Sequence, residues 1–192
     1  MLALVQLYLR DFDPEIAAAA SKLMTKLVPG ATFRPEPQLR RPKQATLEEV
    51  QVLPKRAVLM MADGSKIELE LLIEDAPMAV ARFVKLAQAR YYDGLTFHRI
   101  VPNFVIQGGS PDANEYSGDD RFMRDELGRV PHLRGSVGIS TRGRDTGDAQ
   151  IFIDLLDLPR LDHDYTVFAT VTSGLDAVDH ILEGAVIIKI VV

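Results

Sequence analysis

Residues 97–109 read Phe97-His98-Arg99-Ile100-Val101-Pro102-Asn103-Phe104-Val105-Ile106-Gln107-Gly108-Gly109, and this stretch decides the fold of the chain. Its apolar runs predict two short strands joined by a turn at Pro102-Asn103. Arg99 and Gln107 lie inside these apolar runs, where a polar or charged side chain needs either a partner or a function. The pair Gly108-Gly109 then predicts a sharp turn, because glycine adopts conformations that a Cβ obstructs.

Short strands continue on both sides of this stretch. Two of them, near 56–61 and 66–73, flank Asp63-Gly64, which is a strong hairpin signal. In the second strand Ile67, Leu69 and Leu71 alternate with glutamates, so one face of this strand is expected to be buried. Further strands are expected near 136–140, 150–154, 166–172 and 185–192, and helices are expected from Pro77 to about residue 91 and over 174–182.

About eight strands at close spacing, the last able to pair near the first, predict a mainly β fold. The expected architecture is a closed antiparallel barrel whose ends are covered by the two helices. The segment 108–134 has no strand or helix pattern, and a loop of this length in a compact domain is usually functional.

Residues 1–30 predict a helical appendage. Asp13 is a good N-cap, and Pro14 suits the first helical position. The expected apolar face consists of Ile16, Ala17, Ala20, Leu23, Met24 and Leu27. The segment resembles one helical pair of a HEAT-type array, and a single repeat cannot bury its own apolar face. Two interpretations stay open: a fragment whose upstream helical repeats belong to a longer chain, or a native N-terminal helix packed on the main domain.

Residues 31–50 are rich in proline and arginine and predict a linker, which leaves 51–192 as the main domain. The net charge of −5 argues against a nucleic-acid-binding protein. The chain has no cysteine and only four histidines, none in an H-x-x-x-H pair, so a metal site is not expected. No apolar run is long enough to predict a membrane span, and the start is a poor signal peptide. We expect a monomer, cytoplasmic by default or periplasmic if an upstream signal has been removed.

The stretch from Tyr92-Asp93-Gly94 to Gln107-Gly108-Gly109 closely resembles the signature of the cyclophilins, which are peptidyl-prolyl cis-trans isomerases. Asp145-Thr146-Gly147-Asp148-Ala149-Gln150-Ile151-Phe152-Ile153 is similar to the second active-site strand of that family, and 161–169 to its third block. The resemblance covers about 55–192. It implies an eight-stranded closed barrel capped by two helices, proline-containing polypeptides as substrates, and chemistry without a metal or cofactor.

The resemblance also implies roles for individual residues. Arg99 is the candidate catalytic donor, Gln107 would orient it, and Phe104 would line the pocket for the prolyl ring. The implied substrate-binding residues are Val105, Ser140, Thr141, Gln150, Phe152, Leu161 and Tyr165. Taken singly, each residue has a structural alternative: an ion pair for Arg99, plain core for the apolar residues, and strand-edge capping for the glutamines.

Two positions depart from well-known eukaryotic members. Tyr165 stands where they carry a pocket histidine, and similar bacterial members also have tyrosine there. Arg160 stands where they carry a tryptophan that contributes to cyclosporin binding, so weak cyclosporin binding is expected. His98 should point to the face opposite Arg99 and be structural. The other three histidines are expected to lack convergent partners.

The reaction that the resemblance implies needs little chemistry. Rotation about an Xaa–Pro amide is opposed by resonance, with a barrier of about 18–20 kcal/mol. Twisting the bond returns electron density to the prolyl nitrogen, so a donor aimed there binds the twisted state more strongly than the planar one. The alternatives are a peptide-binding module with little turnover and, more weakly, a structural domain tethered to a helical array.

Overall fold

The computed structural model describes residues 2–192, which fall into two compact units. The first contains the chain up to residue 42 together with 120–122, and the second contains 43–119 and 123–192. No helix in the described part of the chain is both long and apolar enough to cross a membrane.

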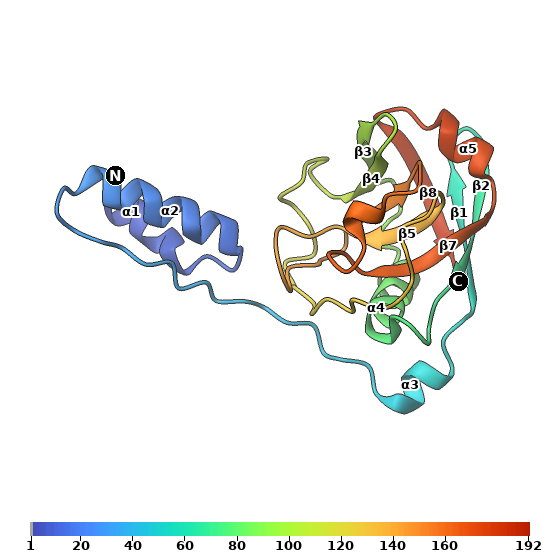
Figure 1. The fold of residues 1–192 in the computed structure, drawn as a ribbon, viewed down its shortest axis with the longest axis horizontal. Coiled ribbons are helices and arrows are strands. Elements are labelled where there is room, and N and C mark those ends of the chain that lie inside the picture. The colour runs from blue at the N-terminus through green and yellow to red at the C-terminus, as the bar shows by residue number, and fades with distance from the viewer. Residues whose placement is uncertain (1) are drawn as a thin grey trace. The chain divides into compact units, whose positions relative to one another are not determined.

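The first unit is a small helical hairpin (Figure 1). It contains α1 (Leu2–Leu7), a 3-10 turn η1 (Tyr8–Arg10) and α2 (Pro14–Leu27). As the sequence predicts, Pro14 is at the first position of α2 and the Asp13 side chain accepts a hydrogen bond from the Glu15 amide, at 2.8 Å. Of the predicted apolar face, Ala17, Ala20 and Met24 are buried. Leu23 and Leu27 of the same face are 44% and 42% exposed.

The segment that joins the hairpin to the barrel domain along the chain contains neither helix nor strand for most of its length. It ends in a short helix, α3 (Leu47–Gln51), inside the stretch expected to be a linker. Thr46 and Glu49 form a reciprocal capping box at the start of α3, with the Thr46 amide 2.7 Å from a Glu49 carboxylate oxygen. This T-x-x-E spacing is a helix-start signal that the sequence already contained.

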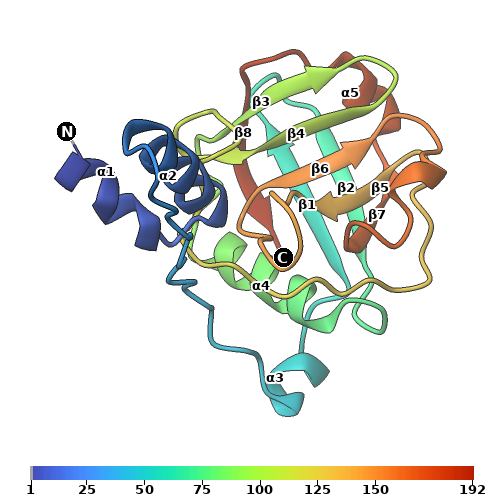
Figure 2. The same ribbon diagram turned by 60° about the vertical axis from the view of Figure 1, so that its left-hand side comes forward.

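The second unit is the predicted closed antiparallel barrel of eight strands (Figures 1 and 2). Around the barrel the order is β1-β2-β7-β5-β6-β4-β3-β8, and β8 pairs with β1 to close it. The strands are β1 (Arg56–Met61), β2 (Lys66–Leu71), β3 (Thr96–Val101), β4 (Val105–Ser110), β5 (Ser136–Ile139), β6 (Ile151–Asp154), β7 (Val167–Ser173) and β8 (Ala185–Val191).

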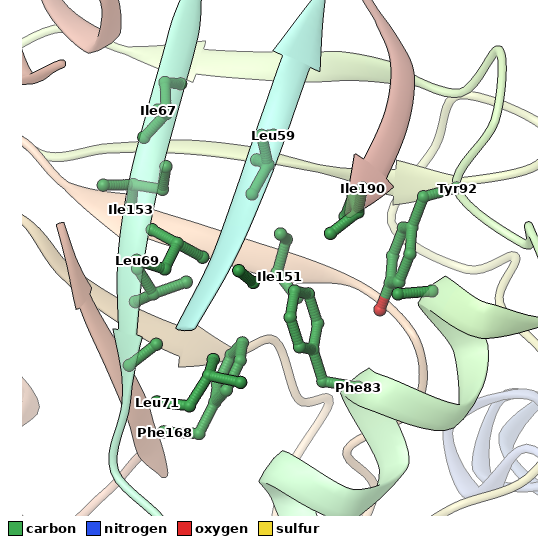
Figure 3. Packing of buried hydrophobic residues seen from close by; sticks show 14 of the residues in the cluster. Leu59, Ile67, Leu69, Leu71, Phe83, Tyr92, Ile151, Ile153, Phe168 and Ile190 are labelled. Atoms are coloured by element: carbon green, nitrogen blue, oxygen red, sulfur yellow. The ribbon is translucent and has the colours of Figure 1, made fainter. Parts of the chain in front are cut away.

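Two helices cover opposite ends of the barrel, α4 (Pro77–Gln88) at one end and α5 (Leu175–His180) at the other (Figure 2). The alternation in β2 is as expected, with Ile67, Leu69 and Leu71 buried and the intervening glutamates exposed. Figure 3 shows these side chains inside the barrel, where Phe83 of α4 packs close to Phe168 of β7, with ring centroids 5.0 Å apart. The barrel interior is therefore filled by side chains.

The stretch 97–109 forms the β3–β4 hairpin. The turn lies at Pro102-Asn103, where Asn103 has a φ of 58° and the Phe104 amide bonds the Val101 carbonyl at 3.0 Å. The expectation of a sharp turn at Gly108-Gly109 is wrong, because both residues remain in β4. A Cβ on Gly108 would lie 2.8 Å from the Thr96 carbonyl oxygen, so glycine is needed here for close approach of two strands.

The long connection between β4 and β5 is held by side chains rather than by regular structure. Glu126 accepts hydrogen bonds from the Met78 and Ala79 amides, at 3.1 and 2.7 Å. These amides are in the first turn of α4, whose N-cap residue Ala76 has no side chain to cap it. Asp125 and Asp145 each accept the other's amide, at 2.9 and 3.0 Å, and fix the same connection from the other side.

Candidate functional site

The candidate residues lie on one cross-strand row on the outside of the barrel. Arg99 of β3 is opposite Gln107 of β4, Gln107 is opposite Phe152 of β6, and Phe152 is opposite Gly138 of β5. Directly paired residues in a sheet project to the same face. The row therefore places a cation, a neutral amide and an aromatic ring side by side across three strands.

Arg99 is held at two edges of its planar guanidinium. One Nη1 proton is donated to Gln107 Oε1 at 3.2 Å, and Nε lies 3.2 Å from a carboxylate oxygen of Glu115. The Arg99 side chain is 36% exposed, so it remains accessible to a ligand. Arg99 thus makes both the contact with Gln107 and an ion pair, which was the structural alternative for this residue.

Gln107 is almost fully buried and is the centre of a polar network. Its Nε2 donates to Ser140 Oγ at 3.0 Å and to Gln150 Oε1 at 2.8 Å. Gln150 in turn donates to the carbonyls of Asn114 and Ser117, at 3.1 and 2.8 Å. The network connects Arg99 through two buried amides to the β4–β5 connection, so the guanidinium is attached to a fixed frame.

Next to the network lies a second apolar cluster, separate from the barrel core, which we call the outer cluster. Its members are Val105, Phe152, Leu158 and Leu161, with Phe104 and Tyr165 packed against them. The structure therefore brings together all of the apolar residues that the sequence assigned to substrate binding. Tyr165 meets Phe152 edge-on, with ring centroids 5.7 Å apart and an interplanar angle of 88°.

Gly138 makes room for the ring of Phe152. A Cβ on Gly138 would be 2.7 and 2.9 Å from Cε1 and Cε2 of that ring, which real Cβ atoms essentially never approach so closely. The ring thus lies directly over the β5 backbone. Sequence reasoning did not identify Gly138, and only its pairing with Phe152 across two strands reveals the requirement.

The expectation that His132 lacks convergent partners is wrong. Its Nδ1 lies 2.8 Å from Asp154 Oδ2, and both side chains are fully buried. The imidazole stacks on Phe152 with centroids 5.8 Å apart and faces Tyr165 edge-on at 6.4 Å. His132 therefore packs against the outer cluster, and no local sequence signal indicated this because its partners are distant along the chain.

Two predicted site residues are less well connected. Thr141 follows Ser140 and is half-buried, but among residues 2–192 no side-chain hydrogen bond joins it to the network. Phe104 is half-buried, and the guanidinium carbon of Arg160 lies 4.3 Å from its ring centroid, a cation–π contact. The position expected to hold a tryptophan in eukaryotic members is therefore filled by a cation over the cluster edge.

Two buried ionisable residues, Asp148 and His98, lie near the candidate residues in the chain. Burial raises the pKa of Asp148, although the neighbouring amide of Gln150 and the guanidinium of Arg142 oppose this shift. Burial lowers the pKa of His98, which is 8% exposed and lies at a register shift of β3. Within residues 2–192 no group of three or more histidine, aspartate and glutamate side chains is placed to hold a metal ion.

Comparisons with known proteins identify the family of the chain. The family model described as cyclophilin type peptidyl-prolyl cis-trans isomerase/CLD matches residues 57–189. A peptidyl-prolyl cis-trans isomerase of Helicobacter pylori is 38% identical over 153 residues, covering 78% of this chain and 94% of the relative. Peptidyl-prolyl cis-trans isomerase B of Bacillus subtilis is 42% identical over 134 residues, covering 69% and 94%.

A solved structure has the same fold. The cyclophilin type peptidyl-prolyl cis-trans isomerase of Cryptosporidium parvum superposes with a TM-score of 0.66 at 24% identity, covering 71% of this chain and 96% of that one. The family match includes all or most of each of the eight strands, among them the β3–β4 hairpin and the β6 strand. The chain belongs to the cyclophilin-type peptidyl-prolyl cis-trans isomerase family.

Proposed function

We propose that Arg99 is the group through which this isomerase lowers the barrier to rotation about Xaa–Pro bonds. A guanidinium remains charged at all physiological pH values and carries five N–H donors in a fixed plane. In Arg99 the Nε edge and part of Nη1 are occupied by Glu115 and Gln107, which leaves the Nη2 edge for a ligand. A donor at the prolyl nitrogen stabilises the twisted amide more than the planar one.

The outer cluster would hold the pyrrolidine ring. Phe152 and Leu161 offer apolar surface, with Val105, Phe104 and Tyr165 around them. Phe152 is directly paired with Gln107, which is paired with Arg99, so a ring packed on Phe152 would lie one strand away from Gln107 and two from Arg99. Burial of apolar area then supplies affinity without requiring a covalent step.

The substrate backbone would lie along the end of β5. Ser140 and Gln150 are joined by a hydrogen bond from the Ser140 amide to the Gln150 carbonyl, at 2.9 Å, and both contact Gln107. Backbone groups of Ser140 and Thr141 are our candidates for holding the peptide, with Thr141 acting through its main chain rather than its side chain.

One observation carries this proposal: a single cross-strand row joins the cation, its orienting amide and the aromatic ring. The test is the rate of cis–trans exchange of an Ala-Ala-Pro-Phe peptide. Arg99→Ala should lower kcat/KM by about tenfold or more, equivalent to about 1.4 kcal/mol of transition-state stabilisation. Arg56→Ala, which removes an exposed arginine of β1, is the matched control and should leave the rate unchanged.

Phe152→Ala should act differently, raising KM more than it lowers kcat, because it removes binding surface for the ring in both ground and transition states. Equal rates for the wild type and Arg99→Ala, with peptide still bound, would mean that Arg99 serves binding or structure and not turnover.

We further propose that residues 51–192 are the isomerase domain, that residues 1–30 are a helical appendage and that 31–50 join them. The clustering of the chain into two units supports this division, because the boundary between them falls within the joining segment, after residue 42. The acidic net charge argues against a nucleic-acid ligand, and we propose that the protein acts on polypeptides as a monomer. Deleting residues 1–42 should leave the isomerase rate on short peptides unchanged.

A further inference from the structure

Arg99 forms an ion pair with Glu115, a partner that the sequence did not single out among the many carboxylates. Glu115 belongs to the connection after β4, and its carboxylate oxygen lies 3.2 Å from Nε of Arg99. The Glu115 side chain is 53% exposed, so its negative charge also faces solvent. An approaching substrate therefore meets a carboxylate directly beside the proposed catalytic cation.

The backbone around Glu115 is fixed by several hydrogen bonds. The side chain of Asn114 accepts from the Tyr116 and Ser117 amides, at 2.8 and 2.9 Å. The Glu115 carbonyl accepts from Nη1 of Arg142 at 2.5 Å. The buried amide of Gln150 bonds the carbonyls on both sides of Glu115. Glu115 thus lies in a turn whose backbone is held by hydrogen bonds.

We propose that Glu115 is a specificity-determining residue that makes this isomerase favour a cationic over an anionic residue immediately before the proline. The proposal rests on the proposed function of Arg99. If Arg99 lies at the prolyl nitrogen, the residue bonded to that nitrogen is the substrate residue closest to the Arg99–Glu115 pair. A carboxylate in that substrate residue is repelled by Glu115 and competes with it for Arg99, whereas an ammonium group is attracted to Glu115.

Neighbouring charges do not cancel this effect. Arg142 is engaged by the Glu115 carbonyl and lies 3.5 Å from the buried carboxylate of Asp148, so this second pair is close to neutral. Arg160 lies over Phe104, on the outer cluster. Glu115 is therefore the exposed negative charge in direct contact with Arg99, and neutralising it adds one positive charge to the site.

The experiment measures kcat/KM for Ala-Lys-Pro-Phe and Ala-Glu-Pro-Phe peptides and takes the ratio, which cancels any general change in activity. In a buffer of low ionic strength the Lys/Glu ratio should fall by about three- to tenfold in Glu115→Gln and further in Glu115→Lys. High salt should suppress most of this change, because it screens charges at an exposed site. Glu68→Gln, with the same charge change on an exposed residue of β2, should leave the ratio unchanged.

A ratio that is the same in the wild type, Glu115→Gln and Glu115→Lys overturns the proposal, as does an equal shift in Glu68→Gln. Thermal melting of each variant verifies that it is folded. The uncharged Ala-Ala-Pro-Phe peptide separates the two proposals. If Arg99→Ala slows turnover of this peptide while the Lys/Glu ratio is the same with and without Glu115, the proposed role of Arg99 stands and that of Glu115 fails. If Arg99→Ala has no effect on it, the proposed function itself fails.

Discussion

Replacing Gln107 with leucine tests whether the buried amide acts through Arg99. Leucine keeps a similar side-chain volume, so the change removes the amide without opening a large cavity. It deletes the hydrogen bond that Arg99 donates to Gln107 and the two that Gln107 Nε2 donates to Ser140 and Gln150. The structure allows the effects on stability and on activity to be worked out separately.

The stability effect comes mainly from Gln150. Its side-chain oxygen loses its donor, and Gln150 is only 1% exposed, so water cannot readily replace the bond. A buried acceptor left unpaired costs about 1–3 kcal/mol. For a domain of this size about 1 kcal/mol lowers the melting temperature by about 2–4 °C, so the melting temperature should fall by several degrees.

The activity effect comes from Arg99. Without Gln107 the guanidinium keeps only the contact with Glu115, and the orientation of its Nη2 edge is no longer fixed. Losing a hydrogen bond to a charged group in a partly exposed site is worth roughly 1.4 kcal/mol, which is about tenfold in kcat/KM.

A double-mutant cycle with Arg99→Ala makes the test specific, because residues that act as a unit give non-additive losses. If Gln107 works through Arg99, the double variant should isomerise the uncharged peptide at the rate of Arg99→Ala alone, while still showing the lower melting temperature. Multiplicative losses in the double variant would refute the reasoning. So would a Gln107→Leu enzyme whose kcat/KM is within twofold of the wild type.

Four further outcomes are expected. Gly138→Ala should displace the Phe152 ring, which should lower kcat/KM by about tenfold and destabilise the fold by about 1–3 kcal/mol. Gly128→Ala, where a Cβ makes only ordinary contacts, should have neither effect. Glu126→Ala removes the cap of α4, so urea unfolding should show a loss of about 0.5–2 kcal/mol with activity retained in the folded enzyme. Because burial lowers the pKa of His98, the neutral ring stabilises the fold above the unfolded pKa of about 6.5, and this contribution is lost as the pH falls through the folded value. The unfolding free energy of the wild type relative to His98→Gln should therefore decrease from neutral to acidic pH, and a constant difference would contradict this. Arg160→Trp should strengthen cyclosporin binding in a fluorescence titration, and tight binding by the wild type would contradict the expectation drawn from Arg160.

Much of the barrel could be predicted from local patterns. Alternation in β2 and the Asp63-Gly64 turn are short-range signals, and the structure has these two strands and the helix that starts at Pro77 where they were expected. The β3–β4 hairpin was also predicted, but the position of Gly108 inside β4 was not. Its role depends on the Thr96 carbonyl of the neighbouring strand, and a contact across a ladder is invisible to local propensity.

The site was predicted unevenly for the same reason. Arg99, Gln107 and Phe152 stood out as polar or aromatic residues in matching motifs, and register places them in one row. Glu115 gave no signal, since a glutamate in a polar loop is ordinary and only the path of the connection brings it to Arg99. His132 is a second example, because its partners Asp154 and Tyr165 are 22 and 33 residues away along the chain.

The central claim is that Arg99 accelerates rotation about the Xaa–Pro amide bond and does not only contribute to substrate binding. Exchange NMR on a saturating Xaa-Pro peptide measures the cis–trans rate on the enzyme, and a titration of the same peptide measures its Kd. In Arg99→Ala we predict that the on-enzyme rate falls by about tenfold or more while Kd changes by less than about threefold. An unchanged on-enzyme rate, with the whole loss appearing in Kd, would contradict the claim.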